Sequence, residues 1–369
     1  MTTGKQLFTT LSSDGNLTLE VSEQTFPEPK PHQVLVKMEA APINPSDLAI
    51  LTSAADFENA EYSPGKVVAK MPQPFLSGQK ARHDQRLPAG NEGAGTVIAA
   101  GDSEQAQALI GQRVACVPGH AFSQYAIADA MMCLPLGDNS CEDGASSFVN
   151  PMTALGFVEN AKMDGAKAIL HTAGASNLGQ MLVKICLEDG IPLVNIVRNA
   201  QNVEMLKSLG AQYVVNSSDE DFMDQLRKAI DETDAYYGFD PIGGGKSVDT
   251  AFKAMEQVAA RKMTEFSRYG SNQQKRMFIY GRLDTSETIL TPSYGFGWTL
   301  SGWLLTPFLS SAGFETITRM RQRVLDNLTT TFASSYKAKV DLEGMLTKDA
   351  ILDYKRMKTG EKYLVTPWG

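Results

Sequence analysis

The residues His171-Thr-Ala-Gly-Ala-Ser-Asn-Leu-Gly-Gln180 decide the fold, because they join a short apolar strand at 168–171 to an amphipathic helix. Gly174 and Gly179 hold the first and third positions of the pattern G-x-G-x-x-G, and Ser176 replaces the middle glycine. Such a turn lets the backbone approach a pyrophosphate closely, and the N-terminus of the following helix holds the anion. The serine still permits this approach, and its hydroxyl could donate to a phosphate. Because similar turns often serve packing alone, the surrounding sequence has to decide.

The sequence after this turn alternates between helices and strands. A helix is predicted from residue 178, because apolar residues recur every three or four positions up to Cys186, and Gly190 is typical of a helix end. This alternation indicates an α/β fold, in which helices cover both faces of a doubly wound parallel sheet. Further strands are predicted at 193–197, 213–215, 235–239 and 277–280.

The chain before residue 166 reads differently. Short strands are predicted at 17–21, 34–38, 95–99 and 113–117, so this part is rich in β-structure. Two polar stretches, 56–86 and 264–275, are predicted to be loop insertions.

Arg198 stands where a protein that binds NAD carries an acidic residue. Proteins with this fold place Asp or Glu about twenty residues after the last glycine, where the carboxylate binds the ribose hydroxyls. No carboxylate stands at this distance from Gly179, and the Arg198 guanidinium could instead bind a 2′-phosphate. The alternative is a surface arginine in an ordinary salt bridge. The position favours NADPH as the cofactor.

The composition argues against several classes of partner. The formal net charge is −8, and Glu265 interrupts the most basic stretch, so a nucleic acid is not expected. No apolar run reaches the length of a membrane span and no secretory signal is visible, which predicts a cytoplasmic protein without a membrane partner. The four cysteines form no C-x-x-C pair, so neither a disulfide scaffold nor a thiolate zinc site is expected.

Several motifs together resemble the medium-chain dehydrogenase/reductase superfamily, in its zinc-independent quinone oxidoreductase and enoyl reductase branches. The resemblance covers nearly the whole chain apart from the two polar stretches. It implies a GroES-like β-barrel catalytic domain of residues 1–149 and 320–369, a Rossmann NADP-binding domain of residues 150–319, and an active site in the cleft. The motifs, besides the glycine turn, are Ile43-Asn-Pro-Ser-Asp47, Gly90-Asn-Glu-Gly-Ala-Gly-Thr-Val97, Asn150-Pro-Met-Thr-Ala154, Ser208-Leu-Gly-Ala211, Phe239-Asp-Pro-Ile-Gly-Gly244 and the segment 341–367.

The resemblance also implies a reaction without a metal. Zinc-dependent members of the superfamily hold their catalytic metal with a cysteine, a histidine and a second cysteine. The corresponding residues here are Asn44, Asn91 and Asn150, and amides are poor zinc ligands. Glu92, next to the second of them, is expected to form structural hydrogen bonds inside the barrel domain.

On this resemblance the chain is an enzyme, an NADPH-dependent oxidoreductase that transfers hydride to a quinone or another electron-poor enone. Asn44 and Thr153 correspond to positions near the nicotinamide, and each has a donor for the oxygen that gains charge, so they are the predicted catalytic residues. Their structural alternatives are a turn and a helix cap, respectively. The predicted cofactor-binding residues are Gly174, Ala175, Ser176, Asn177, Leu178, Gly179, Arg198, Asn216 and Gly281.

Two other functions stay open. A 2-enoyl thioester reductase of this branch carries a tyrosine soon after the Asn-Pro-Ser-Asp motif, but residues 48–56 contain none, and Tyr62 is the nearest replacement. The other alternative is an inactive NADPH-binding protein with a structural or regulatory role. The branch commonly forms homodimers through its Rossmann domains, and the apolar stretch 294–309 is compatible with such an interface. Its Phe296, Trp298 and Trp303 could instead form an apolar wall for a quinone ring.

Overall fold

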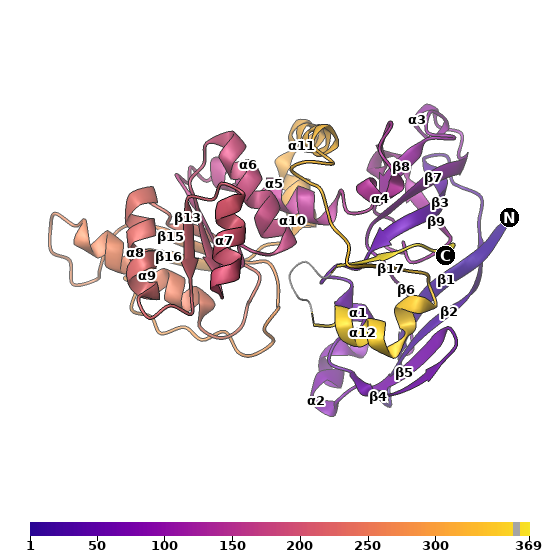
Figure 1. The fold of residues 1–369 in the computed structure, drawn as a ribbon, viewed down its shortest axis with the longest axis horizontal. Coiled ribbons are helices and arrows are strands. Elements are labelled where there is room, and N and C mark those ends of the chain that lie inside the picture. The colour runs from indigo at the N-terminus through magenta and orange to yellow at the C-terminus, as the bar shows by residue number, and fades with distance from the viewer. Residues whose placement is uncertain (357–361) are drawn as a thin grey trace. The chain divides into compact units, whose positions relative to one another are not determined.

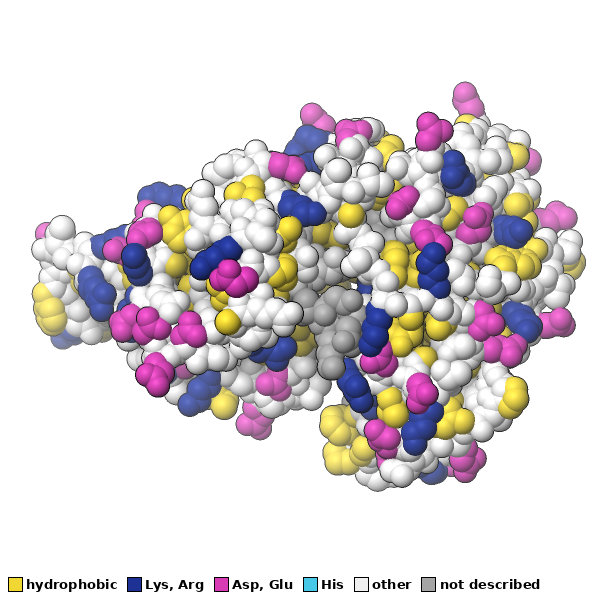
Figure 2. Space-filling model, in the orientation of Figure 1, with side chains coloured by type: hydrophobic (Ala, Val, Ile, Leu, Met, Phe, Trp, Pro, Cys, Tyr) yellow, Lys and Arg dark blue, Asp and Glu magenta, His cyan; other side chains and the backbone are white. Residues whose placement is uncertain are grey.

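The computed structural model describes residues 1–356 and 362–369. The chain divides into two compact units: unit 1 is Met1–Val149 with Arg323–Gly369, and unit 2 is Asn150–Gln322 (Figure 1). The predicted position of the second boundary was 319/320. None of the described helices combines the length and apolar character that a membrane crossing needs. On the face that Figure 2 shows, acidic and basic side chains are interspersed over the surface.

Unit 2 is built on a six-stranded sheet in the order β13-β12-β11-β14-β15-β16, in which every neighbouring pair is parallel. The predicted α/β class with a parallel sheet is therefore confirmed. The strand order reverses between β11 and β14, which makes this the topological switch point of the sheet. The strands are β11 (Ile169–His171), β12 (Leu193–Val197), β13 (Tyr213–Asn216), β14 (Tyr237–Asp240), β15 (Lys275–Ile279) and β16 (Trp298–Gly302).

Helices connect these strands, and their ends follow local sequence signals. Ser176 caps α6, and Gly190 ends it with a left-handed backbone (φ 67°), as its position predicts. Helix α8 begins at Phe222, and Asp221 precedes it without a capping hydrogen bond from its side chain. The helices are α5 (Val149–Met163), α6 (Asn177–Asp189), α7 (Ala200–Ser208), α8 (Phe222–Thr233), α9 (Ser247–Arg261), α10 (Leu305–Ala312) and α11 (Phe314–Asp326).

Unit 1 contains two sheets around one apolar core. The first has the order β4-β5-β2-β1-β6, and the second β10-β8-β7-β3-β18-β17, with β9 also paired to β3. The strands are β1 (Thr2–Leu11), β2 (Asn16–Phe26), β3 (Gln33–Pro42), β4 (Asp56–Ser63), β5 (Lys66–Lys70), β6 (Arg86–Pro88), β7 (Gly93–Ala100), β8 (Arg113–Cys116), β9 (Tyr125–Asp129), β10 (Leu134–Pro135), β17 (Ala338–Val340) and β18 (Tyr363–Val365).

Short helices complete unit 1. They are α1 (Leu48–Leu51), α2 (Gln73–Leu76), α3 (Glu104–Gln107), α4 (Cys141–Gly144) and α12 (Lys348–Tyr354), together with the 3-10 turns η1 (Ser77–Arg82), η2 (Ala130–Met132) and η3 (Gly344–Leu346). Strand β18 pairs antiparallel with β3, so a late segment of the chain completes a sheet that begins near residue 33.

The prediction that residues 56–86 form a loop insertion is wrong. They form β4, β5 and β6, and the β4–β5 hairpin extends the first sheet beside β2. The core of unit 1 contains Phe57, Val67 and Ala69 of this stretch. The polar residues between them face outward, which is why the stretch resembles a loop in the sequence.

Residues 264–274 form a loop, as predicted, and β15 begins at Lys275. The buried carboxylate of Glu256 fixes the end of this loop. It accepts hydrogen bonds from Ser271 N (2.8 Å) and Ser271 Oγ (2.6 Å), and it forms an ion pair with Lys275 Nζ at 2.7 Å.

Candidate active site

The glycine turn joins β11 to α6 at the carboxyl edge of the sheet in unit 2. Ser176 Oγ accepts a hydrogen bond from Gly179 N (3.0 Å) and donates one to Ala173 O (2.8 Å). The serine hydroxyl is thus used inside the turn, which disagrees with the expectation that it donates to a phosphate. Binding of an anion here would depend on the backbone N–H groups of the first helical turn, which have no acceptor within the helix.

Both glycines of the turn are required by close packing. A Cβ atom at Gly174 would lie 2.8 Å from the Cβ of Asn195, and one at Gly179 would lie 2.3 Å from the carbonyl oxygen of Gly174. Glycine at these positions brings α6 and the backbone of the turn close to the sheet. The resulting compact strand–turn–helix junction is the arrangement that binds a pyrophosphate in dinucleotide-binding folds.

Arg198 follows the last residue of β12 and is exposed at the same edge of the sheet. Among the described residues, no carboxylate forms an ion pair with its guanidinium, so the predicted alternative of an ordinary salt bridge is not realised there. Its carbonyl oxygen accepts a hydrogen bond from Ser218 Oγ at 2.7 Å. The main chain of Arg198 is thus held in place by this hydrogen bond, while its exposed guanidinium is available to bind an anion.

Asn216 lies beside Arg198, because it pairs with Val197 across β12 and β13. Its Nδ2 donates to Asp219 Oδ1 (2.6 Å), and its Oδ1 accepts from Ser218 N (3.2 Å). The side chain therefore holds the turn after β13. Its predicted contact with a cofactor would require these bonds to rearrange or would involve its backbone.

Asp240 ends β14 at the switch point, and its side chain is fully buried. Its carboxylate accepts hydrogen bonds from Gly243 N (2.7 Å), Ser247 Oγ (2.8 Å) and Thr172 Oγ1. This carboxylate shapes the loop after β14. Its role was missed in the sequence, although the Phe239-Asp-Pro-Ile-Gly-Gly motif contains it.

The loop after β14 packs directly against Gly281, the predicted contact for a carboxamide. A Cβ atom at Gly243 would lie 2.8 Å from the carbonyl oxygen of Gly281, and one at Gly281 would lie 2.7 Å from that of Pro241. The two loops thus touch through their backbones, and Asp240 holds one of them in place.

His171 is a packing residue at the end of β11, directly before the turn. It is fully buried, and its Nε2 lies 2.7 Å from the hydroxyl oxygen of Tyr280. Burial lowers the pKa of His171 to about 3, so the ring is neutral at physiological pH.

Thr153 lies in unit 2, at the fifth residue of α5, and its side chain is buried. The alternative that it caps a helix is therefore wrong, because α5 begins at Val149. Its predicted catalytic role stays a prediction.

The three aromatic residues expected to form one wall lie in different surroundings. Phe296 is 81% exposed and contacts Tyr269, whereas Trp298 packs against Phe252. Trp303 is buried against Phe157. The interpretation as a single apolar wall is wrong, because Phe296 is exposed while Trp298 and Trp303 pack against different aromatic residues.

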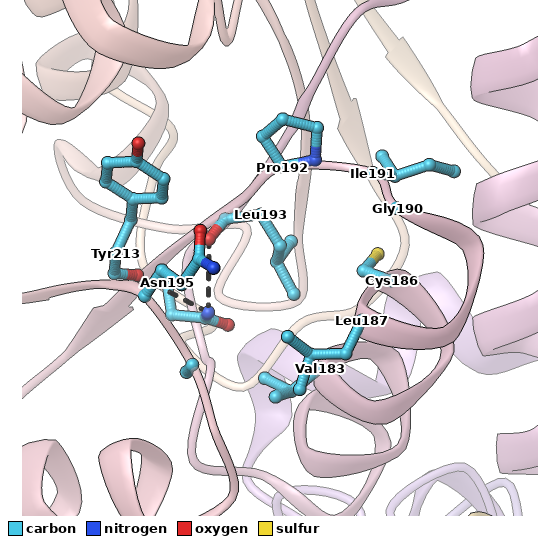
Figure 3. A pocket seen from close by; sticks show the side chains of 11 residues that line it. Val183, Cys186, Leu187, Gly190, Ile191, Pro192, Leu193, Asn195 and Tyr213 are labelled. Atoms are coloured by element: carbon cyan, nitrogen blue, oxygen red, sulfur yellow. Dashed lines mark hydrogen bonds between the residues drawn. The ribbon is translucent and has the colours of Figure 1, made fainter.

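A pocket of about 180 Å³ opens at the amino ends of β12 and β13, where Figure 3 shows Asn195 between Leu193 and Tyr213. Asn195 Nδ2 donates to the carbonyl oxygens of these two residues at 3.5 Å. Dinucleotides bind at the carboxyl ends of the strands in this fold. The pocket therefore does not belong to the predicted cofactor site.

Asn44 lies in unit 1 and is 1% exposed. Its Nδ2 donates to Glu92 Oε1 (2.8 Å), and its Oδ1 has no hydrogen-bond partner among the residues that the structure describes. Its carbonyl oxygen accepts from Asp47 N (3.0 Å), so the predicted turn is present. One donor of the predicted catalytic amide is thus bound to a buried carboxylate.

Glu92 connects Asn44 to the first turn of α5. Its Oε2 accepts hydrogen bonds from Phe148 N and Val149 N, both at 2.9 Å. The carboxylate therefore satisfies backbone donors where the helix starts, which matches the structural role expected for it.

Asp47 adds a second buried carboxylate to this cluster. It accepts hydrogen bonds from Asn44 N (2.8 Å) and Asn91 N (2.9 Å). Burial raises the pKa of Asp47 to about 7, although the two backbone donors act in the opposite direction. The described residues contain no group of three His, Cys, Asp or Glu side chains placed to hold a metal ion.

Comparison with known proteins matches both parts of the chain. Residues 30–146 match the alcohol dehydrogenase GroES-like domain, and residues 177–259 match the family described as zinc-binding dehydrogenase. The GroES-like domain predicted from the sequence is therefore confirmed.

Two curated relatives are similar over part of their length. The mitochondrial enoyl-[acyl-carrier-protein] reductase of Rattus norvegicus is 28% identical over 202 residues, which cover 50% of this chain and 45% of the relative. The chloroplastic quinone-oxidoreductase homolog of Spinacia oleracea is 28% identical over 213 residues, covering 55% and 57%. The chain thus matches about half the length of these relatives.

Solved structures are similar over their whole length. A protein of Mesorhizobium loti described as an NADPH:quinone reductase has 27% identity and a TM-score of 0.74, with 100% of both chains covered. The complex of Etr1p with NADP and crotonyl-CoA has 17% identity and a TM-score of 0.69, covering 99% of this chain and 100% of the other. The second likeness is one of fold.

Proposed function

Because the chain belongs to the medium-chain dehydrogenase/reductase superfamily, in its quinone oxidoreductase and enoyl reductase branch, we propose that it reduces a quinone or another electron-poor enone with NADPH. One observation carries the proposal: a glycine turn of the dinucleotide-binding type lies at the same edge of one parallel sheet as Arg198, which forms no ion pair with any described carboxylate. The relatives support it by their names, which describe reductases of quinones and of enoyl compounds.

The residues of this edge fit NADPH. The first turn of α6 would hold the pyrophosphate, and the Arg198 guanidinium would hold the 2′-phosphate. The loop that Asp240 fixes would place the backbone of Gly281 toward the carboxamide. When bound, NADPH supplies the hydride, and the task of this chain is to orient the acceptor and stabilise its developing charge. We assign that task to Asn44 and Thr153.

The second candidate is a 2-enoyl thioester reductase, because several curated relatives carry that name. The tyrosine typical of that branch is absent from residues 48–56. Tyr62 does not replace it, since its hydroxyl donates to the carbonyl oxygen of Phe57 in the same hairpin (2.7 Å). We therefore place the quinone or enone first.

A panel of acceptors tests the proposal. NADPH oxidation is followed by absorbance with a quinone, an α,β-unsaturated ketone and an enoyl thioester, and NADPH binding is followed by its fluorescence. Turnover of the quinone or the ketone is expected. Preference for the thioester would favour the second candidate, and binding without any turnover would leave an inactive NADPH-binding protein.

We also propose a homodimer in the cytoplasm. Strand β16 is an edge strand of the sheet in unit 2, and unpaired edge strands readily pair with another chain. Exposed Phe296 and Leu304 flank it. Light scattering is expected to give twice the 40.1 kDa of one chain, and a particle of 40.1 kDa would contradict the dimer. Imaging of a tagged chain tests the location, since the relatives named above are organellar.

A further inference from the structure

Three side chains form a hydrogen-bonded series inside unit 1. Lys362 Nζ donates to Ser146 Oγ at 2.8 Å, and Ser146 Oγ lies 2.9 Å from the hydroxyl oxygen of Tyr336. Ser146 is buried, whereas Lys362 and Tyr336 are half-buried at the two ends. The series therefore has a closed middle and two ends with access to solvent.

The hydrogen bonds have one natural direction. The Lys362 ammonium can only donate, so it occupies a lone pair of Ser146 Oγ and leaves the serine hydrogen free to point at Tyr336. The hydrogen of the Tyr336 hydroxyl is then directed away from the serine. Its nearest acceptor is the carbonyl oxygen of Glu142 at 3.4 Å, which is a long contact. The last hydrogen of the series, that of the Tyr336 hydroxyl, is therefore only weakly hydrogen-bonded.

We propose that Tyr336 donates the proton of the reduction and that Ser146 and Lys362 supply its replacement. This inference rests on the proposed function, because reduction of an enone needs one proton besides the hydride.

Tyr336 and the predicted catalytic Asn44 have a common neighbour. Glu92 binds the Asn44 amide, and its charge acts on both Tyr336 and Lys362. The hydroxyls of Tyr62 and Tyr280 are engaged elsewhere: Tyr62 donates to its own hairpin, and Tyr280 is paired with His171. Tyr336 thus combines an available hydrogen with a charged group, Glu92, that also binds Asn44.

The proposed step conserves atoms and electrons. The Tyr336 O–H bond breaks, and its proton bonds to the acceptor atom that holds the electron pair left after hydride addition. The phenolate takes the Ser146 proton, Ser146 takes a proton from Lys362, and Lys362 regains one from water. The two electrons come from the hydride of the proposed reaction, so none of the three side chains is oxidised or reduced.

The electrostatics of the series agree with this direction. Burial lowers the pKa of Lys362 to about 8, although Glu92 and Asp47 act in the opposite direction. Burial raises the pKa of Tyr336, as do Glu92, Asp143 and Glu142, while its hydrogen bond with Ser146 lowers it. At neutral pH the lysine thus carries a transferable proton and the tyrosine stays protonated until the acceptor needs it.

The test compares Tyr336→Phe with Tyr354→Phe, using an α,β-unsaturated ketone and a quinone as acceptors. Tyr354 is a matched control, because its buried hydroxyl donates to the carbonyl oxygen of Met345 in the same unit (3.2 Å). Tyr336→Phe is expected to lower kcat on the ketone by about 10²-fold, the usual effect of losing a general acid. Its quinone turnover should fall much less than its ketone turnover, because the oxygens of a reduced quinone take protons readily from water, and its NADPH affinity should stay near wild type.

Each outcome decides the proposal. Unchanged ketone turnover in Tyr336→Phe would overturn it, and so would an equal loss with both acceptors together with weaker NADPH binding. A wild-type chain that oxidises NADPH with neither acceptor would instead remove the proposed function, and this inference with it.

A pH profile tests Lys362 separately. Wild-type kcat on the ketone should fall above about pH 8, where Lys362 loses its proton, whereas Lys362→Met should have a lower kcat without this fall. The charged groups facing Lys362 are Glu92 and Asp47. A fall at the same pH in Lys362→Met would exclude the lysine from the series.

Discussion

The buried carboxylate of Glu92 allows a sharp test of the hydrogen-bond geometry in unit 1. It accepts hydrogen bonds from three donors, Asn44 Nδ2, Phe148 N and Val149 N, and Glu92→Ala would remove the acceptor of all three. Removing one partner from a buried charged network costs about 3–5 kcal/mol of unfolding free energy. We expect a loss of that size.

Glu92→Gln should be much milder. The glutamine Oε1 can take the place of the carboxylate oxygen that accepts from the two backbone donors. Its Nε2 then faces Asn44, and it can donate to Asn44 Oδ1 if the Asn44 amide flips. This oxygen has no partner among the described residues of the wild type. The variant then loses the charge but keeps the number of hydrogen bonds, for a cost of about 1–2 kcal/mol.

Urea unfolding followed by circular dichroism measures both variants of Glu92. Glu39→Gln is the control, because the carboxylate of Glu39 is exposed, and it should change stability by less than about 0.5 kcal/mol. A Glu92→Gln variant as unstable as Glu92→Ala would refute the reasoning from geometry, as would an alanine variant with wild-type stability.

Four further predictions concern the two units. Arg198→Ala should remove most of a preference for NADPH over NADH worth about 1.5–3 kcal/mol, measured by titration calorimetry; equal wild-type affinities would contradict the role of Arg198. Thr153→Val should lower kcat by about 10²–10³-fold with near-normal melting, and unchanged turnover would return Thr153 to a packing role. Activity should survive prolonged EDTA treatment, and elemental analysis should find no stoichiometric zinc, whereas activity restored by added zinc would overturn the metal-free assignment. As the pH rises from about 3 to 6.5, the unfolding free energy of the wild type should increase more than that of His171→Gln, because in that window His171 is protonated only in the unfolded chain; equal pH dependence of the two would contradict the burial of His171 as a neutral ring.

The parallel sheet of unit 2 was predictable because each buried strand carries a local signal. β12 has the predicted bounds, since Leu193–Val197 is an apolar run between a glycine helix end and a polar helix start. Residues 56–70 gave no such signal. β4 is an edge strand whose outward residues are mostly polar. Its Phe57 is buried in the core, whereas Ala60 and Tyr62 are only partly buried against it.

The candidate site was predictable where function depends on position along the chain, as for Gly174, Gly179 and Arg198. It was not predictable where a side chain is committed to a distant partner. The Asn44 amide bonds to Glu92, 48 residues later, and Ser146 meets Tyr336 only after the chain has passed through unit 2. No local pattern records such pairings.

The pairing of β18 with β3 has a consequence for synthesis on the ribosome. Residues 150–322 emerge before residues 338–365, so unit 2 can fold while Ala41 and Pro42 at the end of β3 still lack β18, although β7 and β9 already pair with the rest of the strand. During that interval the end of β3 is open to unwanted pairing, and nascent chains with open strand edges are prone to aggregate. Truncations that remove β18 should therefore fail in the cell through association of unit 1, even where unit 2 is correctly folded.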